Sequence, residues 1–309
     1  MSEFDLIRRF FADRSRGAGV VCGVGDDGAV LQADPDCELV MSIDTLLGGV
    51  HFPDDLPAAD IGWRSLAVNL SDLAAMAATP RWCLLSLALP EVDEDWLAAF
   101  CDGFYSLAEQ AGITLVGGDL VRGPLSVTVQ VTGEVPRGSA LTRAGGHAGE
   151  RLCIGGVPGE AAAGLALWLD GKREGDLVAR LARPQPQCQL GLALRGLATA
   201  CIDISDGLLA DLGHLLRASQ VPGARIDLQC LPQSVALQGW AGPTQRRRAQ
   251  LSGGDDYLLL FSLADAAELP AGCSVIGRLE SSPGIRVVDE QGGVIDIDGH
   301  GYDHFSGAF

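Results

Sequence analysis

The sequence predicts a mixed α/β (α+β) fold divided into two domains. Apolar runs typical of strands alternate with helix-like patterns along the 309 residues, and hydrophobic residues make up 47% of the chain, enough for a substantial core. A glycine-rich, charged segment with few large apolar residues, 136–149, interrupts this alternation. We therefore expect an N-terminal domain over residues 1–138 and a C-terminal α/β domain over residues 149–309.

In the N-terminal domain, apolar runs bounded by turn-forming residues predict strands. We expect them at residues 38–43, 83–89, 113–116 and 125–134. A helix is expected at residues 94–110, because its periodic pattern ends just before Gly112.

A further helix, expected at residues 63–78 and stopped by Pro80, carries two stripes of different polarity. Its leucines follow the spacing of a buried stripe, whereas Ser65, Asn69 and Asp72 align on a separate polar stripe. That polar stripe faces either a site or water.

In the C-terminal domain the same reasoning predicts a second sheet. Its strands are expected at residues 151–154, 200–204, 225–228, 257–262, 274–276 and 285–288, and its helices at 159–169 and 187–198. The clearest unit is the strand at 200–204, the turn Ser205-Asp206-Gly207 and a leucine-rich amphipathic helix after it.

The charge balance and the distribution of apolar residues exclude several classes of protein. With 22 Lys and Arg against 40 Asp and Glu, the net charge is −18, which opposes binding to nucleic acid. No apolar stretch approaches the roughly 20 residues of a membrane span, and the first residues lack the apolar centre of a signal peptide, so we expect a cytoplasmic protein without a membrane partner. The nine scattered cysteines form no Cys-x-x-Cys pair, which favours reduced, mostly buried thiols.

Two common nucleotide-binding loops are also excluded. The segment at residues 23–28, Gly-Val-Gly-Asp-Asp-Gly, matches the letters of a dinucleotide-binding loop, but its two carboxylates would repel a pyrophosphate. No P-loop sequence G-x-x-x-x-G-K-[ST] occurs in the chain. A nucleotide would therefore need another means of binding.

Aspartates beside glycine or serine recur, mostly where a predicted strand ends. They are Asp26, Asp27, Asp44, Asp119, Asp203 and Asp206, with Asp72 added from the polar stripe. Separate carboxylates that converge on a polyphosphate are typical of Mg²⁺ sites. Taken singly, each of these sequences is also an ordinary turn or helix cap, and calcium is the other cation that such ligands suit.

Other side chains suit a phosphate or an organic ligand. Arg143, in a glycine-rich segment, is either a phosphate clamp or a solvated charge of the linker. His51 and Asp255 each follow a glycine pair, where a side chain and the backbone can both meet a ligand. Tyr302 either stacks on a heteroaromatic ring or anchors the C-terminus.

Taken together, these motifs resemble the thiamine-monophosphate kinase family, in the superfamily that includes aminoimidazole ribonucleotide synthetase. In the family's order they read GVGDDGAVL, SIDTLLGGVHF, NLSDLAAMAATP, VGGDL, LTRAGGHAGE, DISDGLLADL, SGGDDY and GYDHF. The resemblance implies that ATP phosphorylates thiamine monophosphate to thiamine diphosphate by direct in-line transfer, with several Mg²⁺ ions and no phosphoenzyme.

The resemblance also implies roles for individual residues. As metal ligands it implies Asp27, Ser42, Ile43, Asp44, Asp72, Asp119, Asp203 and Asp206, among which Asp44, Asp119 and Asp206 are the catalytic positions. As ATP contacts it implies Gly118, Asp119, Arg143 and Ser205, and on the thiamine-phosphate side His51, Asp255 and Tyr302. Two positions depart from the family pattern: Ile43 stands where Thr is frequent, so only its backbone can bind metal, and Asp255 replaces the usual Glu, which shortens its reach.

The family fold implies a homodimer in which two N-terminal domains share a β-barrel. Three other members of the superfamily use ATP. The hydrogenase-maturation carbamoyl dehydratase needs a C-terminal cysteine and selenophosphate synthetase a Cys or selenocysteine with a Lys near its start, and this chain has neither. Aminoimidazole ribonucleotide synthetase and a non-catalytic metal- or nucleotide-binding module stay open as alternatives.

Overall fold

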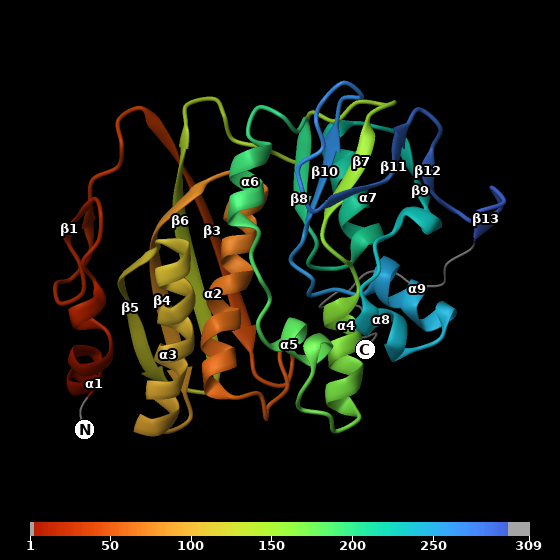
Figure 1. Ribbon diagram of the computed structural model, residues 1–309. Helices are drawn as coiled ribbons and strands as arrows, with labels where there is room; N and C mark the ends of the chain where they lie inside the picture. The colour runs from red at the N-terminus through yellow and green to blue at the C-terminus, as the bar shows by residue number, and fades with distance from the viewer. Residues whose placement is uncertain (1–2, 296–309) are drawn as a thin grey trace. The chain divides into compact units, whose positions relative to one another are not determined.

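A computed structural model describes residues 3–295, and the chain divides into two compact units (Figure 1). The first unit comprises Met1–Leu73 and Ala78–Gly138. The second comprises Ala74–Ala77 and Ser139–Phe309. The mixed α/β class predicted from the sequence is confirmed, since each unit combines a sheet with helices.

In the first unit, long strands alternate with two long helices. Its elements are α1 (Glu3–Phe10), the short 3-10 helix η1 (Ala12–Arg14), β1 (Val20–Cys22), β2 (Val30–Leu31), β3 (Cys37–Leu47), α2 (Ala58–Ala75), β4 (Thr79–Leu89), α3 (Glu94–Ala111), β5 (Thr114–Arg122) and β6 (Ser126–Pro136). Among the described residues, β3-β6-β4-β5 form a four-stranded sheet in that order, antiparallel except for the parallel pair β4 and β5. Helices α2 and α3 lie side by side on one face of this sheet (Figure 1).

The two faces of β3 differ sharply in exposure. Val40 and Leu46 are buried, whereas Met41 and Ile43 on the opposite face are 64% and 61% exposed. This alternation follows from the two-residue period of a strand. In the single chain, one face of β3 therefore packs inward and the other presents apolar side chains to solvent.

Two strands run further than the sequence predicts. Asp44 and Asp119 were expected where strands end, but β3 continues to Leu47 and β5 to Arg122. The cause is tertiary, because β3 pairs with β6 along its whole length and β5 pairs with β4 up to Leu89. Both aspartates therefore lie inside strands, and the expectation that they mark strand ends is wrong.

The second unit contains the larger sheet and the remaining helices. Its elements are β7 (Arg151–Gly155), α4 (Glu160–Leu169), α5 (Asp176–Ala182), α6 (Cys188–Leu194), β8 (Ala200–Asp203), α7 (Leu208–Ser219), β9 (Gly223–Asp227), η2 (Leu228–Cys230), α8 (Val235–Trp240), α9 (Pro243–Ser252), β10 (Leu259–Leu263), β11 (Cys273–Glu280), β12 (Gly284–Val288) and β13 (Val294–Ile295). Within residues 3–295 they form a seven-stranded sheet of order β13-β12-β9-β11-β7-β10-β8, in which only β9 and β12 are parallel neighbours. Every strand predicted for this half lies in that sheet.

The central strands of the second sheet are buried on both faces. Ile202 packs into a core formed with the leucines of α7, whereas its neighbour Cys201 packs into a second core that includes Leu194 of α6. The same alternation separates Leu260 from Phe261 on β10. Two hydrophobic cores thus hold this sheet, one on each side.

All nine cysteines lie within the described part of the chain and are free thiols. Four of them, Cys83, Cys101, Cys153 and Cys201, are buried, so burial is less general than expected. No helix between residues 3 and 295 is long and apolar enough to cross a membrane. None of the sheets, which include a small β1-β2 pair, closes into a barrel within these residues, and the expected barrel between two copies stays a prediction.

Candidate active site

In the first unit, the polar stripe of α2 meets the inward face of β3. Ser42 Oγ donates to Asp72 Oδ2 at 2.5 Å, and the backbone N–H of Asp44 donates to Asn69 Oδ1 at 3.0 Å. Asn69 is itself fully buried and donates its amide to Ser65 O at 3.0 Å. The stripe therefore faces the strand and brings Ser42, Asp44 and Asp72 onto one surface.

The carboxylates of this surface disfavour one another's charge. Burial, and after it the nearby Asp72, raises the pKa of Asp44 to about 6. Two carboxylates and a hydroxyl on one half-buried surface are hard oxygen donors of the kind that Mg²⁺ prefers, and a cation would offset their repulsion. The donor set thus fits the expected metal.

Gly118 and Asp119 are both exposed on β5. At Gly118, where φ is 151°, a Cβ atom would lie 1.8 Å from Leu85 O, so only glycine fits the close pairing with β4. An apolar recess beside this pair is lined by Phe11, Leu87 and neighbouring side chains. The β4 backbone fills the space that a side chain on Gly118 would take, and the exposed backbone of Gly118 lines the recess together with Asp119.

Two other residues expected at the site, Asp27 and His51, lie outside the helices and strands of the first unit. Asp27 is exposed, and its N–H donates to Asp26 Oδ1 at 2.9 Å. His51 accepts the N–H of Leu47 on Nδ1 at 3.0 Å, which fixes the ring at the end of β3. Ile43, between Ser42 and Asp44, turns its side chain to the exposed face, as any strand neighbour must.

In the second unit, Asp203 ends β8 and is buried, and the Ser205-Asp206-Gly207 turn follows it. The N–H groups of all three turn residues donate to one oxygen, Oδ2 of Asp211, at 3.1, 3.0 and 3.1 Å. Burial has the largest effect on the pKa of Asp211 and, together with the nearby charge of Asp206, raises it to about 6; the three hydrogen bonds act in the opposite direction. One buried carboxylate thus accepts hydrogen bonds from every residue of the turn.

The Gly-Gly-Asp-Asp-Tyr segment is bound to the same turn. Asp255 donates its N–H to Ser205 O at 2.9 Å, and Tyr257 donates its N–H to Ile204 O at 2.8 Å. Both residues have positive φ, 68° and 51°, and Tyr257 Oη donates to Asp255 Oδ1 at 3.0 Å. The left-handed backbone explains why β10 begins at Leu259 instead of residue 257.

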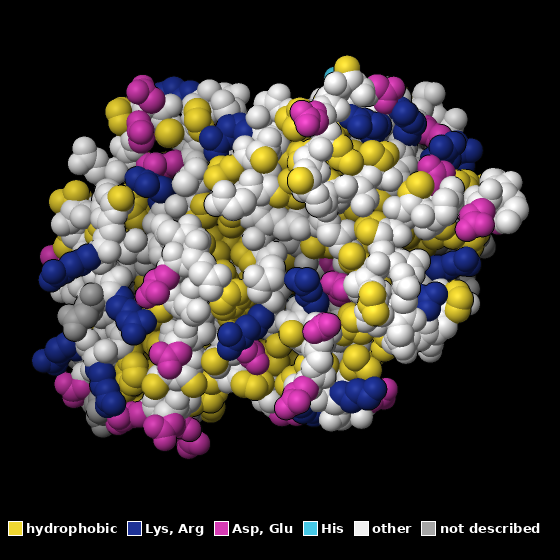
Figure 2. All heavy atoms as spheres, viewed as in Figure 1, with side chains coloured by type: hydrophobic (Ala, Val, Ile, Leu, Met, Phe, Trp, Pro, Cys, Tyr) yellow, Lys and Arg dark blue, Asp and Glu magenta, His cyan; other side chains and the backbone are white. Residues whose placement is uncertain are grey.

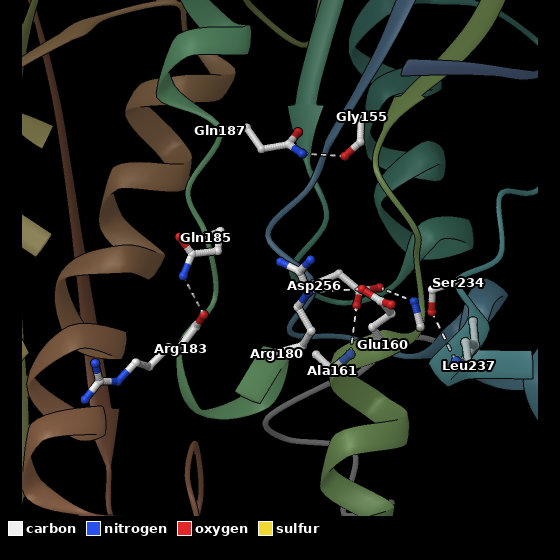
Figure 3. A network of polar contacts seen from close by, with 11 residues as sticks. Gly155, Glu160, Ala161, Arg180, Arg183, Gln185, Gln187, Ser234, Leu237 and Asp256 are labelled. Atoms are coloured by element: carbon white, nitrogen blue, oxygen red, sulfur yellow. Dashed lines mark hydrogen bonds and ion pairs between the residues drawn. The ribbon is translucent and has the colours of Figure 1, made fainter. Parts of the chain in front are cut away.

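Asp256, the next residue, caps a helix with its side chain (Figure 3). It accepts the N–H of Gly159 at 2.5 Å and that of Ala161 at 3.1 Å, at the start of α4. Burial raises the pKa of Asp256 to about 7, despite these two hydrogen bonds. Glu160, in the same turn, is paired with Arg180 at 3.2 Å. This network anchors one end of the Asp255 segment.

Arg143 lies exposed in the second unit, with its carbonyl accepting from Ser219 Oγ at 2.8 Å. Tyr302 lies outside the described residues.

Figure 2 shows one face of the molecule, on which Lys and Arg side chains lie singly or in small groups among Asp and Glu. Between residues 3 and 295, no three His, Cys, Asp or Glu side chains lie close enough together to hold a metal ion. The expected ligands are divided between the two units.

Sequence reasoning missed three residues that shape these loops: Asp211, Asp256 and Tyr257. Asp211 stands in the first turn of an amphipathic helix, where an acid is a helix-start signal, and that signal alone could have drawn attention to it. Asp256 and Tyr257 follow Asp255 directly, but nothing in their spacing shows which of the three side chains faces inward.

Comparison with known proteins gives one consistent result. Residues 25–135 match the family model described as "AIR synthase related protein, N-terminal domain". The thiamine-monophosphate kinase of Escherichia coli (strain K12) is 43% identical over an alignment that covers 98% of each chain.

Solved structures agree with this similarity. The thiamine-monophosphate kinase of Stenotrophomonas maltophilia K279a is 44% identical, with a TM-score of 0.86 over 93% of this chain and 96% of that one. A structure described as AaThiL complexed with AMPPCP and TMP is 31% identical, with a TM-score of 0.80 over 91% of this chain and 92% of the other. The similarity thus extends over both units.

Proposed function

This chain belongs to the thiamine-monophosphate kinase family, and we propose that it transfers the γ-phosphoryl group of ATP to thiamine monophosphate, giving thiamine diphosphate and ADP. The observation that carries the proposal is full-length similarity, at 43% identity, to a curated member of that family. The AaThiL complex supports the substrate pair, since AMPPCP is an analogue of ATP.

In the proposed reaction, a phosphate oxygen of thiamine monophosphate attacks the γ-phosphorus of ATP in line with the bond to the β-phosphate. That bond breaks as the new P–O bond forms, and ADP leaves with the electron pair. The attacking oxygen is already ionised near neutral pH, so no strong general base is required. The protein's main tasks are to position two anions and to offset their charge.

The residues that would hold Mg²⁺ are those implied by the family resemblance. Ser42, Asp44 and Asp72 support this proposal most directly because their oxygen atoms share one surface of the first unit. Asp27, Asp119, Asp203, Asp206 and the backbone of Ile43 complete the proposed set. Bound Mg²⁺ would neutralise charge that develops on the phosphate oxygens.

The same proposal assigns ligand contacts to other residues. Gly118, Asp119, Arg143 and Ser205 would contact ATP, and the exposure of Gly118 and Asp119 beside the apolar recess supports their part in this set. His51, Asp255 and Tyr302 would contact thiamine monophosphate. Asp255 is one methylene shorter than the Glu that is usual in the family, and the hydrogen bond from Tyr257 Oη holds its carboxylate in one orientation, which supports its part in this set.

We also propose that the protein works as a cytoplasmic homodimer. The first unit would be its ATP-binding and dimerisation domain, and the second unit its C-terminal α/β domain. The exposed face of β3 supports this assembly. Leu39, Met41, Ile43 and Leu47 share that face and are 39–64% exposed in the single chain. Contiguous apolar surface of this kind is typical of a protein interface.

The proposal is tested by following ADP and thiamine diphosphate with ATP, thiamine monophosphate and Mg²⁺ present. We expect both products in a one-to-one ratio, and EDTA in excess should stop their formation. ATP binding without either product would instead favour the non-catalytic module. Product from aminoimidazole ribonucleotide precursors, and none from thiamine monophosphate, would move the chain to the synthetase branch.

A further inference from the structure

Asp211 has a contact pattern that the proposed roles leave unexplained. Its side chain is 3% exposed, and a single oxygen, Oδ2, accepts the N–H groups of three consecutive residues, Ser205, Asp206 and Gly207. Three successive backbone N–H groups that converge on one anion form a nest, which here is filled by a carboxylate of the protein itself.

Helix capping accounts for only part of this pattern. An acid in the first turn of a helix ordinarily reaches back to the N–H of the N-cap residue, which for α7 is Gly207. Asp211 reaches two residues beyond that, to Asp206 and Ser205. It therefore determines the path of the turn before the helix as well as the start of the helix.

The opposite side of the turn holds the Asp255 segment. Ser205 O accepts the N–H of Asp255 at 2.9 Å, and a Cβ atom on Gly254 would lie 2.4 Å from the same oxygen. Asp211 binds the donors of the turn while Asp255 binds its acceptor. A change in the turn must therefore move Asp206 and Asp255 together.

We propose that Asp211 is a positioning residue that, through the turn, holds Asp206 and Asp255 in the arrangement used for phosphoryl transfer. The inference rests on the proposed function, in which Asp206 binds metal and Asp255 binds thiamine monophosphate. Removing the carboxylate leaves the buried N–H group of Gly207 and the half-buried N–H groups of Ser205 and Asp206 without this acceptor, and the turn must rearrange to bring them to other partners.

The experiment compares Asp211→Ala with Asp211→Asn, which keeps one acceptor oxygen. Amide hydrogen exchange of residues 203–211 reports the turn, titration with Mn²⁺ followed by electron paramagnetic resonance reports metal affinity, and kcat and KM against Mg²⁺ concentration report function. Asp289→Ala is the matched control, because Asp289 also holds a turn of the second unit by accepting two N–H groups, from Gln291 and Gly293.

For Asp211→Ala we expect faster exchange at residues 205–207, together with about a 10–100-fold loss of Mn²⁺ affinity and a matching rise in the Mg²⁺ needed for half-maximal kcat. Asp211→Asn should stay within about threefold of wild type in metal affinity, since its amide oxygen can accept the same N–H groups. A purely structural role would lower the amount of active enzyme but leave the Mg²⁺ dependence unchanged.

Asp211→Glu provides the second test if the alanine variant does not fold. It keeps the charge but displaces the acceptor by one methylene, so its metal affinity should fall below that of Asp211→Asn. Wild-type metal affinity and Mg²⁺ dependence in a folded Asp211→Ala, or in Asp211→Glu, would overturn the inference. Absence of thiamine diphosphate with the wild-type protein would instead refute the proposed function. Hydrogen exchange and Mn²⁺ affinity of the Asp211 variants would still test whether Asp211 positions the turn.

Discussion

Burial is the main cause of the raised pKa values of Asp44 and Asp256, but the two aspartates have different neighbours. Asp44 lies beside a second carboxylate, Asp72, which adds to the rise. Asp256 lies against two backbone N–H groups at the start of α4. Substitution of the first should act on catalysis, and substitution of the second on the pH dependence of stability.

Replacing Asp44 by Asn should lower kcat for thiamine diphosphate formation by at least about a hundredfold while the protein stays folded. The backbone N–H of Asp44 would still bind Asn69, but a charged ligand of the proposed metal set would be lost. Coupled-assay kinetics with circular dichroism measure the two effects. Asp36→Asn, at an exposed position before β3, is the control. Near-normal turnover in Asp44→Asn would contradict the assignment.

Replacing Asp256 by Asn should flatten the pH dependence of the free energy of unfolding between about pH 4 and pH 7. Because the pKa of Asp256 is raised to about 7, the folded protein keeps a proton in this range that the unfolded chain has released. Wild-type stability should therefore fall as the pH rises through the window, by up to a few kcal/mol from this group. Urea unfolding of both proteins at pH 5, 6.5 and 8 measures this pH dependence.

The control for that experiment is Asp93→Asn, which alters an exposed N-cap that also accepts two N–H groups. Its pH profile should remain parallel to that of the wild type. An equally steep fall in stability with rising pH in Asp256→Asn would show that another group is responsible.

At the scale of elements, glycines determine how closely α2 and α3 approach. A Cβ atom on Gly103 would lie 1.7 Å from Ala59 O, and one on Gly62 would lie 2.0 Å from Phe100 O. These distances are far below contact, so a side chain at either position would push the helices apart. The two helices pack backbone against backbone at these points.

Replacing Gly103 by Ala should therefore destabilise the protein by about 2 kcal/mol or more, despite the better helix propensity of alanine. Gly213→Ala provides a matched comparison in α7, where the nearest atom is the end of the Arg217 side chain at 3.4 Å. That substitution should stabilise by up to about 1 kcal/mol. Urea unfolding of both variants gives the signs, and a stabilising Gly103→Ala would refute the close packing.

Most elements could be predicted because their signals are local. Helix α3 occurs as predicted, with Gly112 in the left-handed conformation after its end, and β8 is followed by α7 as expected. The short helices α5, α8 and α9 were not predicted, and neither was α1. Helices α5 and α8 have only seven and six residues, and α9, with the sequence PTQRRRAQLS, is mostly polar, so none of the three shows a long repeat of apolar residues.

At the scale of the whole molecule, the exposed face of β3 has the clearest consequence. We expect the wild-type protein to sediment as a dimer, because two such faces can cover one another. Met41→Glu should shift it to monomer, whereas Leu169→Glu, at a 75% exposed position of the second unit, should not. Sedimentation velocity distinguishes the species. A monomeric wild-type protein, or a dimeric Met41→Glu, would contradict the proposed assembly.

The sequence alone predicted the mixed α/β class and most of the helices and strands. It also predicted the polar stripe of α2 and showed the resemblance to the family. Each depends on neighbours a few residues apart, whose periodicity and caps are visible in the chain itself. The proposed site residues, by contrast, remain predictions drawn from motif order.

Only the tertiary structure decided which groups face one another. Ser42 meets Asp72 across 30 residues, and Asp256 meets Gly159 across 97. Strand pairing extended β3 and β5 past Asp44 and Asp119, and burial raised the pKa of Asp44 and Asp256. Spacing along the chain does not specify such contacts, because they form only when a buried polar group must find its partner on another element.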